Sequence, residues 1–184
     1  MLLEKIENFD IFRPKMDATK EVLHAIATFT VDISPAFPYV NAELGGWDYE
    51  QTNQVLLLKL ADGKWITLHP QKIAIRGIRD LEEAQALLTW IQAQINDIYE
   101  RRETISPRYV SQAGLKVIEI LKLTPMTNCK LCSYKTCMAY AAALREGEIS
   151  LNDCPPLWEE KYREKRHKLQ AYLESFGWRA LDAD

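Results

Sequence analysis

All four cysteines of the 184-residue chain lie in one short segment, as Cys129, Cys132, Cys137 and Cys154. Their spacing is C-x2-C-x4-C-x16-C, and Pro155 directly follows the last of them. Four thiols gathered in an otherwise cysteine-free chain need a common explanation. Two disulfides, a zinc site or an iron–sulfur cluster could each use all four. This segment constrains the chain more than any other feature of its sequence.

The spacing favours a cluster over the other two explanations. A [4Fe–4S] cluster takes one thiolate on each of its four irons. The C-x2-C pair places two thiolates on one tight loop, and the x4 spacer lets the Cys137 thiolate reach a third iron of the cluster. The distant Cys154 supplies the fourth ligand. Zinc sites built from four cysteines more often contain two short C-x2-C knuckles, and this chain has one. We therefore predict that Cys129, Cys132, Cys137 and Cys154 bind a [4Fe–4S] cluster, with zinc and disulfides as the alternatives.

Residues 123–157 also resemble a known family, the [4Fe–4S] domain of the corrinoid iron–sulfur protein large subunit and of the B subunit of the Rnf electron-transport complex. The matching residues are Leu123, Pro125, Thr127, Asn128, the four cysteines, Ala139, Ala141, Leu144, Gly147 and Pro155, with Tyr140 at an aromatic position. The departure is Ser133, where the family usually has glycine, and a positive φ at this position would strain a serine. The resemblance implies one-electron transfer to a low-potential partner in anaerobic metabolism, either a corrinoid protein or another redox protein.

Two classes of function follow from such a cluster. In the first, the protein is an electron carrier, and any corrinoid lies on its partner because this chain lacks the family's corrinoid-binding barrel. In the second, it is a scaffold, maturation or oxygen-sensing protein whose cluster is structural. Lys130, Lys135 and the N-terminus of a helix that starts at Thr136 would stabilise a negatively charged cluster in either class. The chain has no G-x-S-x-G, Walker or G-x-G-x-x-G motif, which favours an electron-transfer or accessory protein over a stand-alone enzyme.

The composition limits the partners and the compartment. The formal net charge of −3 argues against nucleic acid as the main partner. The longest purely apolar run, Cys137–Leu144, is too short to span a bilayer, so we expect no membrane insertion. We expect a cytoplasmic protein, because a reducing compartment keeps four thiols available for a metal.

The hydrophobic pattern predicts an α+β fold with two domains. Residues 1–105 form an antiparallel sheet of four or five strands with packed helices, and residues 106–184 form a small helical [4Fe–4S] domain. The expected strands are 29–33, 39–44, 54–60, 64–68 and 73–78, and the expected helices are 14–27, 81–102, 111–123, 136–145 and 157–176. The apolar run Val55–Leu58 suggests a strand buried on both faces.

Two further groups of residues are candidate sites. His69 with Asp62 or Asp48 could form one, although residues in turns and loops of this kind are usually structural. Trp47 and Tyr49, which follow a Gly-Gly pair, could contact a partner or a flat cofactor, but they more simply cover the edge of the sheet.

Overall fold

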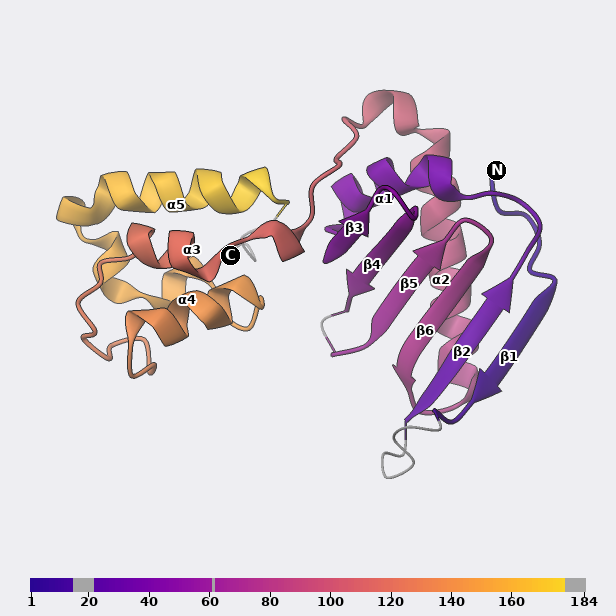
Figure 1. The fold of residues 1–184 in the computed structure, drawn as a ribbon, viewed down its shortest axis with the longest axis horizontal. Helices are drawn as coiled ribbons and strands as arrows, with labels where there is room; N and C mark the ends of the chain where they lie inside the picture. Colours follow the sequence, from indigo (N-terminus) through magenta and orange to yellow (C-terminus); the bar gives the residue numbers. More distant parts are fainter. Residues whose placement is uncertain (15–21, 61, 178–184) are drawn as a thin grey trace. The chain divides into compact units, whose positions relative to one another are not determined.

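The computed structural model describes residues 1–14, 22–60 and 62–177. The chain divides into two compact units, Met1–Ser111 and Gln112–Asp184. The first contains a six-stranded antiparallel sheet and two helices, and the second contains three helices and several short 3-10 turns, which confirms the α+β class (Figure 1). No helix in these described ranges combines the length and the apolar character needed to cross a membrane.

The sheet has the strand order β1-β2-β6-β5-β4-β3. Its strands are β1 (Asn8–Phe12), β2 (Leu23–Thr28), β3 (Asp48–Glu50), β4 (Val55–Lys59), β5 (Trp65–His69) and β6 (Lys72–Ile78). Hairpins join β4 to β5 at Gly63 and β5 to β6 at Pro70, as the turn residues predicted. The expected strands 54–60, 64–68 and 73–78 are thus present, and the sheet is larger than expected.

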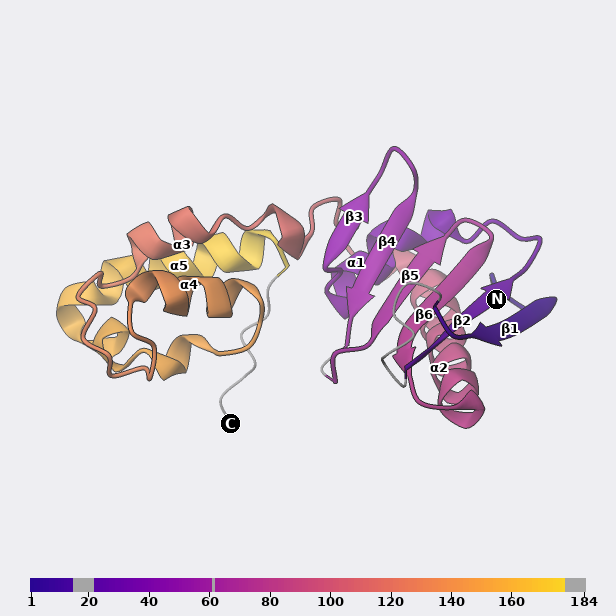
Figure 2. The ribbon, with the colours of Figure 1, turned by 60° about the horizontal axis from the view of Figure 1, so that its bottom comes forward.

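One face of the sheet forms the core of the first unit. Helix α2 (Leu81–Glu100) covers this face, as Figures 1 and 2 show, with Ala84, Leu88, Ile91, Ile95 and Ile98 buried. It begins where predicted, because the Asp80 side chain accepts a hydrogen bond from the amide of Glu83 at 2.8 Å. On β4, Leu56 and Leu58 are buried whereas Val55 and Leu57 are half-buried on the other face. The prediction of burial on both faces is therefore wrong.

The helix predicted over residues 14–27 is wrong for the part that the structure describes, since β2 occupies Leu23–Thr28 and residues 15–21 lie outside the described residues. The spacing of Leu23 and Ile26 fitted a helix. In the sheet, however, the small side chains of Ala25 and Ala27 point to the core, and β2 is hydrogen-bonded to β1 and β6. Pairing with two neighbours overrides a weak local pattern.

The strand predicted over residues 39–44 is also wrong, because helix α1 (Phe37–Leu44) lies there. Pro38 fits the first turn of a helix, and Phe37 and Val40 are buried one helical turn apart. Gly45 ends the helix with a φ of 68°. The chain over residues 29–33 contains no strand.

The helices of the second unit are shorter than predicted. They are α3 (Val117–Leu123), α4 (Cys137–Arg145) and α5 (Arg163–Ser175). A 3-10 turn at Gln112–Gly114 precedes α3, and 3-10 turns over Pro155–Trp158 and Glu160–Tyr162 precede α5. Their shared core comes from buried residues of all three helices and of the turns between them: Leu115, Ile120, Tyr140, Ala141, Leu144, Leu151, Cys154, Leu157, Leu169 and Leu173.

The carboxylate of Glu83, in the first turn of α2, predicts acid sensitivity of the first unit. It accepts hydrogen bonds from the amide of Arg79 at 2.7 Å and its guanidinium at 2.9 Å, and it pairs with Lys64 at 3.1 Å. The Arg79 contacts, followed by Lys64, lower the pKa of Glu83 from 4.5 to about 2. A carboxyl whose pKa is lower in the folded state stabilises the fold above its unfolded pKa, and this stabilisation disappears as the pH falls from 4.5 toward 2.

We expect Glu83→Gln to flatten this pH dependence, as measured by hydrogen exchange of the β5 and β6 amides. Glu82→Gln is the matched control, since the Glu82 carboxylate has no hydrogen bond within the described ranges. Equal acid sensitivity in wild type and Glu83→Gln would contradict the assignment.

Candidate metal centre

The four cysteines lie on three connected parts of the second unit. Cys129 is exposed and Cys132 half-buried on the loop between α3 and α4, Cys137 is the buried first residue of α4, and Cys154 is buried directly after the 3-10 turn Leu151–Asp153. All four cysteines are free in the structure. In the described part of the chain, no three His, Cys, Asp or Glu side chains are grouped closely enough to hold a metal ion.

The thiols nevertheless lie within electrostatic range of one another. Burial and, to a smaller extent, the negative charges of Cys132, Cys137 and Cys129 raise the pKa of Cys154 to about 11, although the Leu157 amide acts in the opposite direction. A buried thiol with three other thiols within electrostatic range ionises reluctantly without a counter-charge. A metal cation at this place would supply that counter-charge, since a coordinating thiol is deprotonated.

Backbone amides favour the thiolate form of three of the four cysteines. The amide of Leu131, helped by the Thr127 side chain, lowers the pKa of Cys129. The amide of Asn128 donates a hydrogen bond to the sulfur of Cys137 at 3.4 Å, and the amide of Leu157, which donates to the Cys154 carbonyl at 3.0 Å, opposes the rise in the pKa of the Cys154 thiol. Hydrogen bonds to sulfur are one of the means by which proteins stabilise iron–sulfur clusters. The donor set therefore fits a group bound through thiolates.

Asn128 joins the start of the loop to the start of α4. Its amide faces the Cys137 sulfur, and its side-chain oxygen accepts a hydrogen bond from the Cys137 amide at 2.8 Å. The sequence identified Asn128 as one of the residues that match the family, but this link across the loop was missed. The signal available was an asparagine directly before the first cysteine.

Four residues of the loop between α3 and α4 have a left-handed backbone conformation. Met126, Asn128 and Lys130 have φ of 58°, 50° and 65° at alternate positions, and Ser133 has a φ of 65°. Alternation of this kind turns successive amides toward one concave side, an arrangement found at many anion and iron–sulfur sites. The strain expected at Ser133 is thus present, at a cost of about 1–2 kcal/mol for a residue other than glycine.

Helices α4 and α5 hold both ends of the cysteine-bearing segment. The buried Tyr140 hydroxyl donates to the carbonyl of Ser150 at 3.2 Å, close to Cys154. Lys165 donates to the carbonyl of Thr124 at 2.8 Å, before the loop, and Arg166 donates to that of Leu157 at 3.3 Å, after Cys154. Lys165 and Arg166, two basic residues of α5, thus have a structural role.

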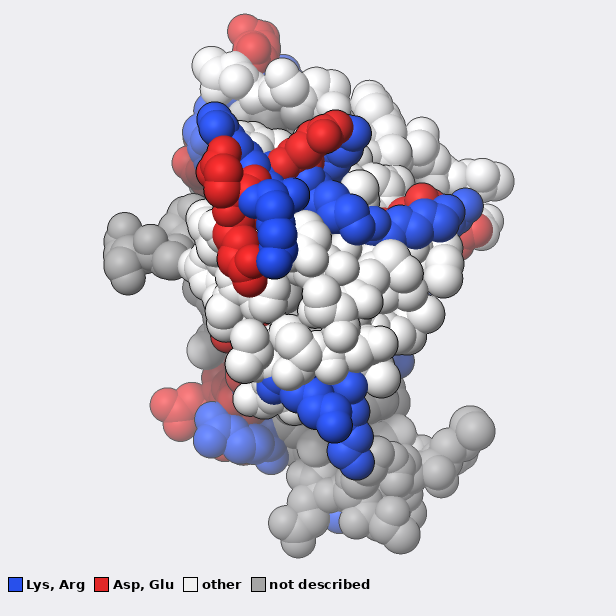
Figure 3. Space-filling view, turned by 90° about the vertical axis from the view of Figure 1, so that its left-hand side faces the viewer, with Lys and Arg blue, Asp and Glu red and all other residues white. Residues whose placement is uncertain are grey.

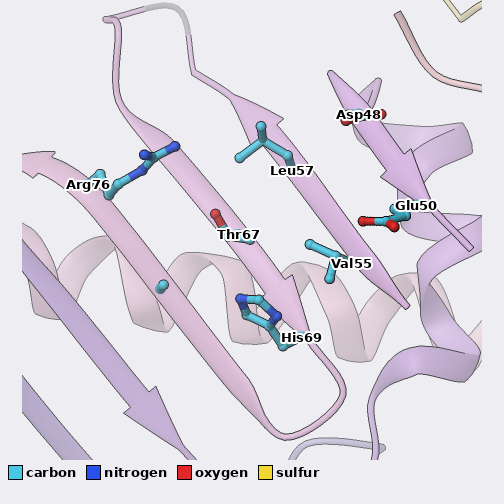
Figure 4. A pocket seen from close by; sticks show the side chains of 8 residues that line it. Asp48, Glu50, Val55, Leu57, Thr67, His69 and Arg76 are labelled. Atoms are coloured by element: carbon cyan, nitrogen blue, oxygen red, sulfur yellow. The ribbon is translucent and has the colours of Figure 1, made fainter. Parts of the chain in front are cut away.

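The open face of the sheet carries a separate hollow of ≈ 390 Å³. Figure 4 shows Asp48 and Glu50 on β3 on one side of it, and His69 and Arg76 on β5 and β6 on the other. Asp48 and His69 thus line one hollow, whereas Asp62 does not line it. Partial burial and then Lys72 lower the pKa of His69. The Trp47 ring packs against another ring of the sheet, that of Trp65, at 5.9 Å.

Comparison with known proteins places the cysteine segment in a family. Residues 125–156 match the family model described as "Putative Fe-S cluster". The gamma subunit of the acetyl-CoA decarbonylase/synthase complex of Methanocaldococcus jannaschii is 40% identical over 55 residues, which cover 30% of this chain and 11% of that protein. The B subunit of the ion-translocating oxidoreductase complex of Azoarcus sp. is 43% identical over 47 residues, which cover 26% of each.

The chain thus spans about a tenth of the first relative and about a quarter of the second. No solved structure matches the chain. The comparisons confirm the resemblance as one of a segment: the chain carries an iron–sulfur cluster domain, and that domain contains all four cysteines.

Proposed function

We propose that Cys129, Cys132, Cys137 and Cys154 hold a [4Fe–4S] cluster and that the protein transfers single electrons to a low-potential redox partner. The observation that carries the proposal is the set of four free thiols inside the matched segment, where a backbone amide donates a hydrogen bond to the sulfur of Cys137. When bound, such a cluster supplies one-electron oxidation and reduction.

The residues around the thiols suit an anionic group. The Asn128 amide donates a hydrogen bond to the Cys137 sulfur, and the Leu131 and Leu157 amides act to lower the pKa of Cys129 and Cys154, so all three favour the thiolate form. Helix α4 directs its N-terminus toward the loop at Cys137, and the positive end of its dipole favours negative charge there. Lys130 and Lys135 add two positive charges beside the ligands.

The exposure of the ligands differs in a way that suits electron transfer. Cys129 is exposed at the surface whereas Cys137 and Cys154 are buried. One side of the site is therefore open to a partner and the other is anchored in the helical core. The relatives are named as subunits of larger complexes, which supports a protein partner in anaerobic metabolism. Any corrinoid would be carried by that partner, and the reducing compartment would be the cytoplasm.

We expect anaerobically prepared protein to gain an electron paramagnetic resonance signal of one unpaired electron on reduction, and to regain its starting spectrum on reoxidation. The measurement is a redox titration followed by this signal. Lys130→Gln with Lys135→Gln should lower the midpoint potential, because removing positive charge disfavours the added electron. If an intact site shows no signal with the strongest chemical reductant, the carrier function fails and a structural or oxygen-sensing role replaces it.

A further inference from the structure

We propose that a redox partner docks on the apolar surface around the first three cysteines, and that the partner's own docking surface is an apolar centre ringed by carboxylates. This inference rests on the proposed electron transfer and specifies the chemistry of the partner. We call the surface formed by Ile118, Met126, Leu131 and Met138, with Lys130 and Lys135, the docking face.

The docking face is apolar at its centre. Leu131, between Cys129 and Cys132, is 65% exposed, and Met126 and Met138 are 52% and 43% exposed. The two methionines line a hollow of ≈ 270 Å³ together with Leu121, Asn128, Thr136 and Cys137. Ile118, half-exposed, lies one helical turn from Leu121 on α3.

Exposed apolar side chains beside a proposed redox site indicate a contact surface. Burying them against a partner is favourable, whereas scattered single residues would need no such explanation. Methionine side chains adapt to different shapes, which suits a contact that must form and dissociate repeatedly. Cys129 and Cys132 belong to the same loop as Met126 and Leu131, and Cys137 begins α4 at the end of that loop, so a partner on this face comes close to the exposed Cys129.

The charge of this segment decides which partner fits. Residues 112–138 contain four lysines against one glutamate, although the whole chain has a net charge of −3. Glu119 is paired with Lys122 at 2.8 Å, while Lys130 and Lys135 form no ion pair with any residue that the structure describes. On the second unit, Figure 3 shows a broad area without charged side chains that is bordered below by basic ones.

Such a surface selects an acidic partner for a simple electrostatic reason. Carboxylates around the partner's apolar centre would meet the two unpaired lysines and guide the encounter, and a basic partner would be repelled. The attraction acts between exposed charges, so it must weaken as salt is added.

The test uses a plant-type [2Fe–2S] ferredoxin of negative net charge as the probe, mixed with cluster-loaded full-length protein. We expect hydrogen exchange to slow over residues 118–138, and we expect the affinity to fall at least about tenfold between 0.05 and 0.5 M NaCl. Leu131→Asp and the Lys130→Gln with Lys135→Gln variant should each weaken binding about tenfold. Lys168→Gln is the matched control on α5, where Lys168 is paired with Glu164, and it should bind as wild type does.

The outcomes separate this inference from the function on which it rests. If the titration shows reversible reduction but the ferredoxin protects no part of residues 118–138, or binds all variants equally, the docking face is wrong and the electron-transfer proposal stands. If the intact site cannot be reduced at all, both fail together. Iron content equal to wild type in Leu131→Asp confirms that a weaker interaction comes from the surface and not from a lost cluster.

Discussion

Anaerobically purified protein is expected to contain about four irons and four acid-labile sulfides per chain, and Cys132→Ala is expected to lose nearly all of both. Each iron corner of a [4Fe–4S] cluster needs a thiolate, and the chain has no fifth cysteine to replace a lost one. Iron, zinc and sulfide analysis of the two proteins, prepared side by side, measures the effect.

The same substitution is expected to disorder the loop but not the first unit. Residues 124–136 contain no helix or strand, and four of them have the strained left-handed conformation, so the loop gains little stability from its own packing. Metal binding should supply the missing stability. Met1–Ser111 has its own core, and we propose that it folds independently.

The control is Ser133→Gly, which changes the neighbouring residue and keeps all four thiols. Glycine accepts the φ of 65° at this position without strain, so this variant should keep full iron and hold it at least as firmly. Stoichiometric zinc without sulfide in the wild-type protein would overturn the cluster assignment. Loss of hydrogen-exchange protection over β4–β6 in Cys132→Ala would overturn the proposed independence of the first unit.

The cysteine spacing was enough to predict a shared metal group, but it did not predict the hydrogen bonds that fix the loop between α3 and α4. A C-x2-C-x4-C-x16-C pattern points to one shared metal group because chemistry fixes the number of thiolates. The link from Asn128 to Cys137 lies in a stretch where Met126, Asn128 and Lys130 are left-handed, and none of them is a glycine that would signal such a backbone. The ligand set itself stays a prediction until iron is measured.

The fold was predictable where local signals agreed with one another. The apolar run Val55–Leu58, the turn at Gly63 and the Asp80 cap placed β4, β5 and α2 correctly. β2 was missed because Ala25 and Ala27 occupy its inward positions. Small alanine side chains do not stand out as the hydrophobic members of an alternating pattern. Such a strand exists because β1 and β6 provide hydrogen-bond partners on both sides, which local sequence does not encode.

Asn41 is expected to control where the first unit ends. It is fully buried on α1, and its side-chain nitrogen donates to the carbonyls of Arg108 at 2.8 Å and Val110 at 2.9 Å. Its oxygen accepts from the buried amide of Gly46 at 3.1 Å. The chain over residues 108–111 is thus held on the first unit, although the sequence indicated that the domain ends at residue 105.

Other contacts act on the same stretch of chain. The Arg108 amide donates to the carbonyl of Pro38 at 2.9 Å, and the side-chain amide of Gln51 donates to the carbonyl of Tyr109 at 3.1 Å. The Ser111 hydroxyl lies 3.3 Å from the Asp48 carboxylate. Among these contacts, only Asn41 is fully buried and uses all of its side-chain polar atoms, so its loss should have the largest effect.

Asn41→Ala is expected to destabilise the first unit by about 2–4 kcal/mol, because the buried Gly46 amide loses its partner and two carbonyls lose theirs in part. Hydrogen exchange of the amides over residues 106–111 should rise more than that of β5, since these residues lose their anchor first. Asn53→Ala is the matched control, because among the residues that the structure describes the exposed Asn53 side chain bonds only to the exposed Glu50. A variant as stable as wild type would show that water replaces the Asn41 amide at no cost. Unchanged exchange over residues 106–111 would show that the other contacts suffice, so that Asn41 does not determine where the link to the cluster-bearing unit begins.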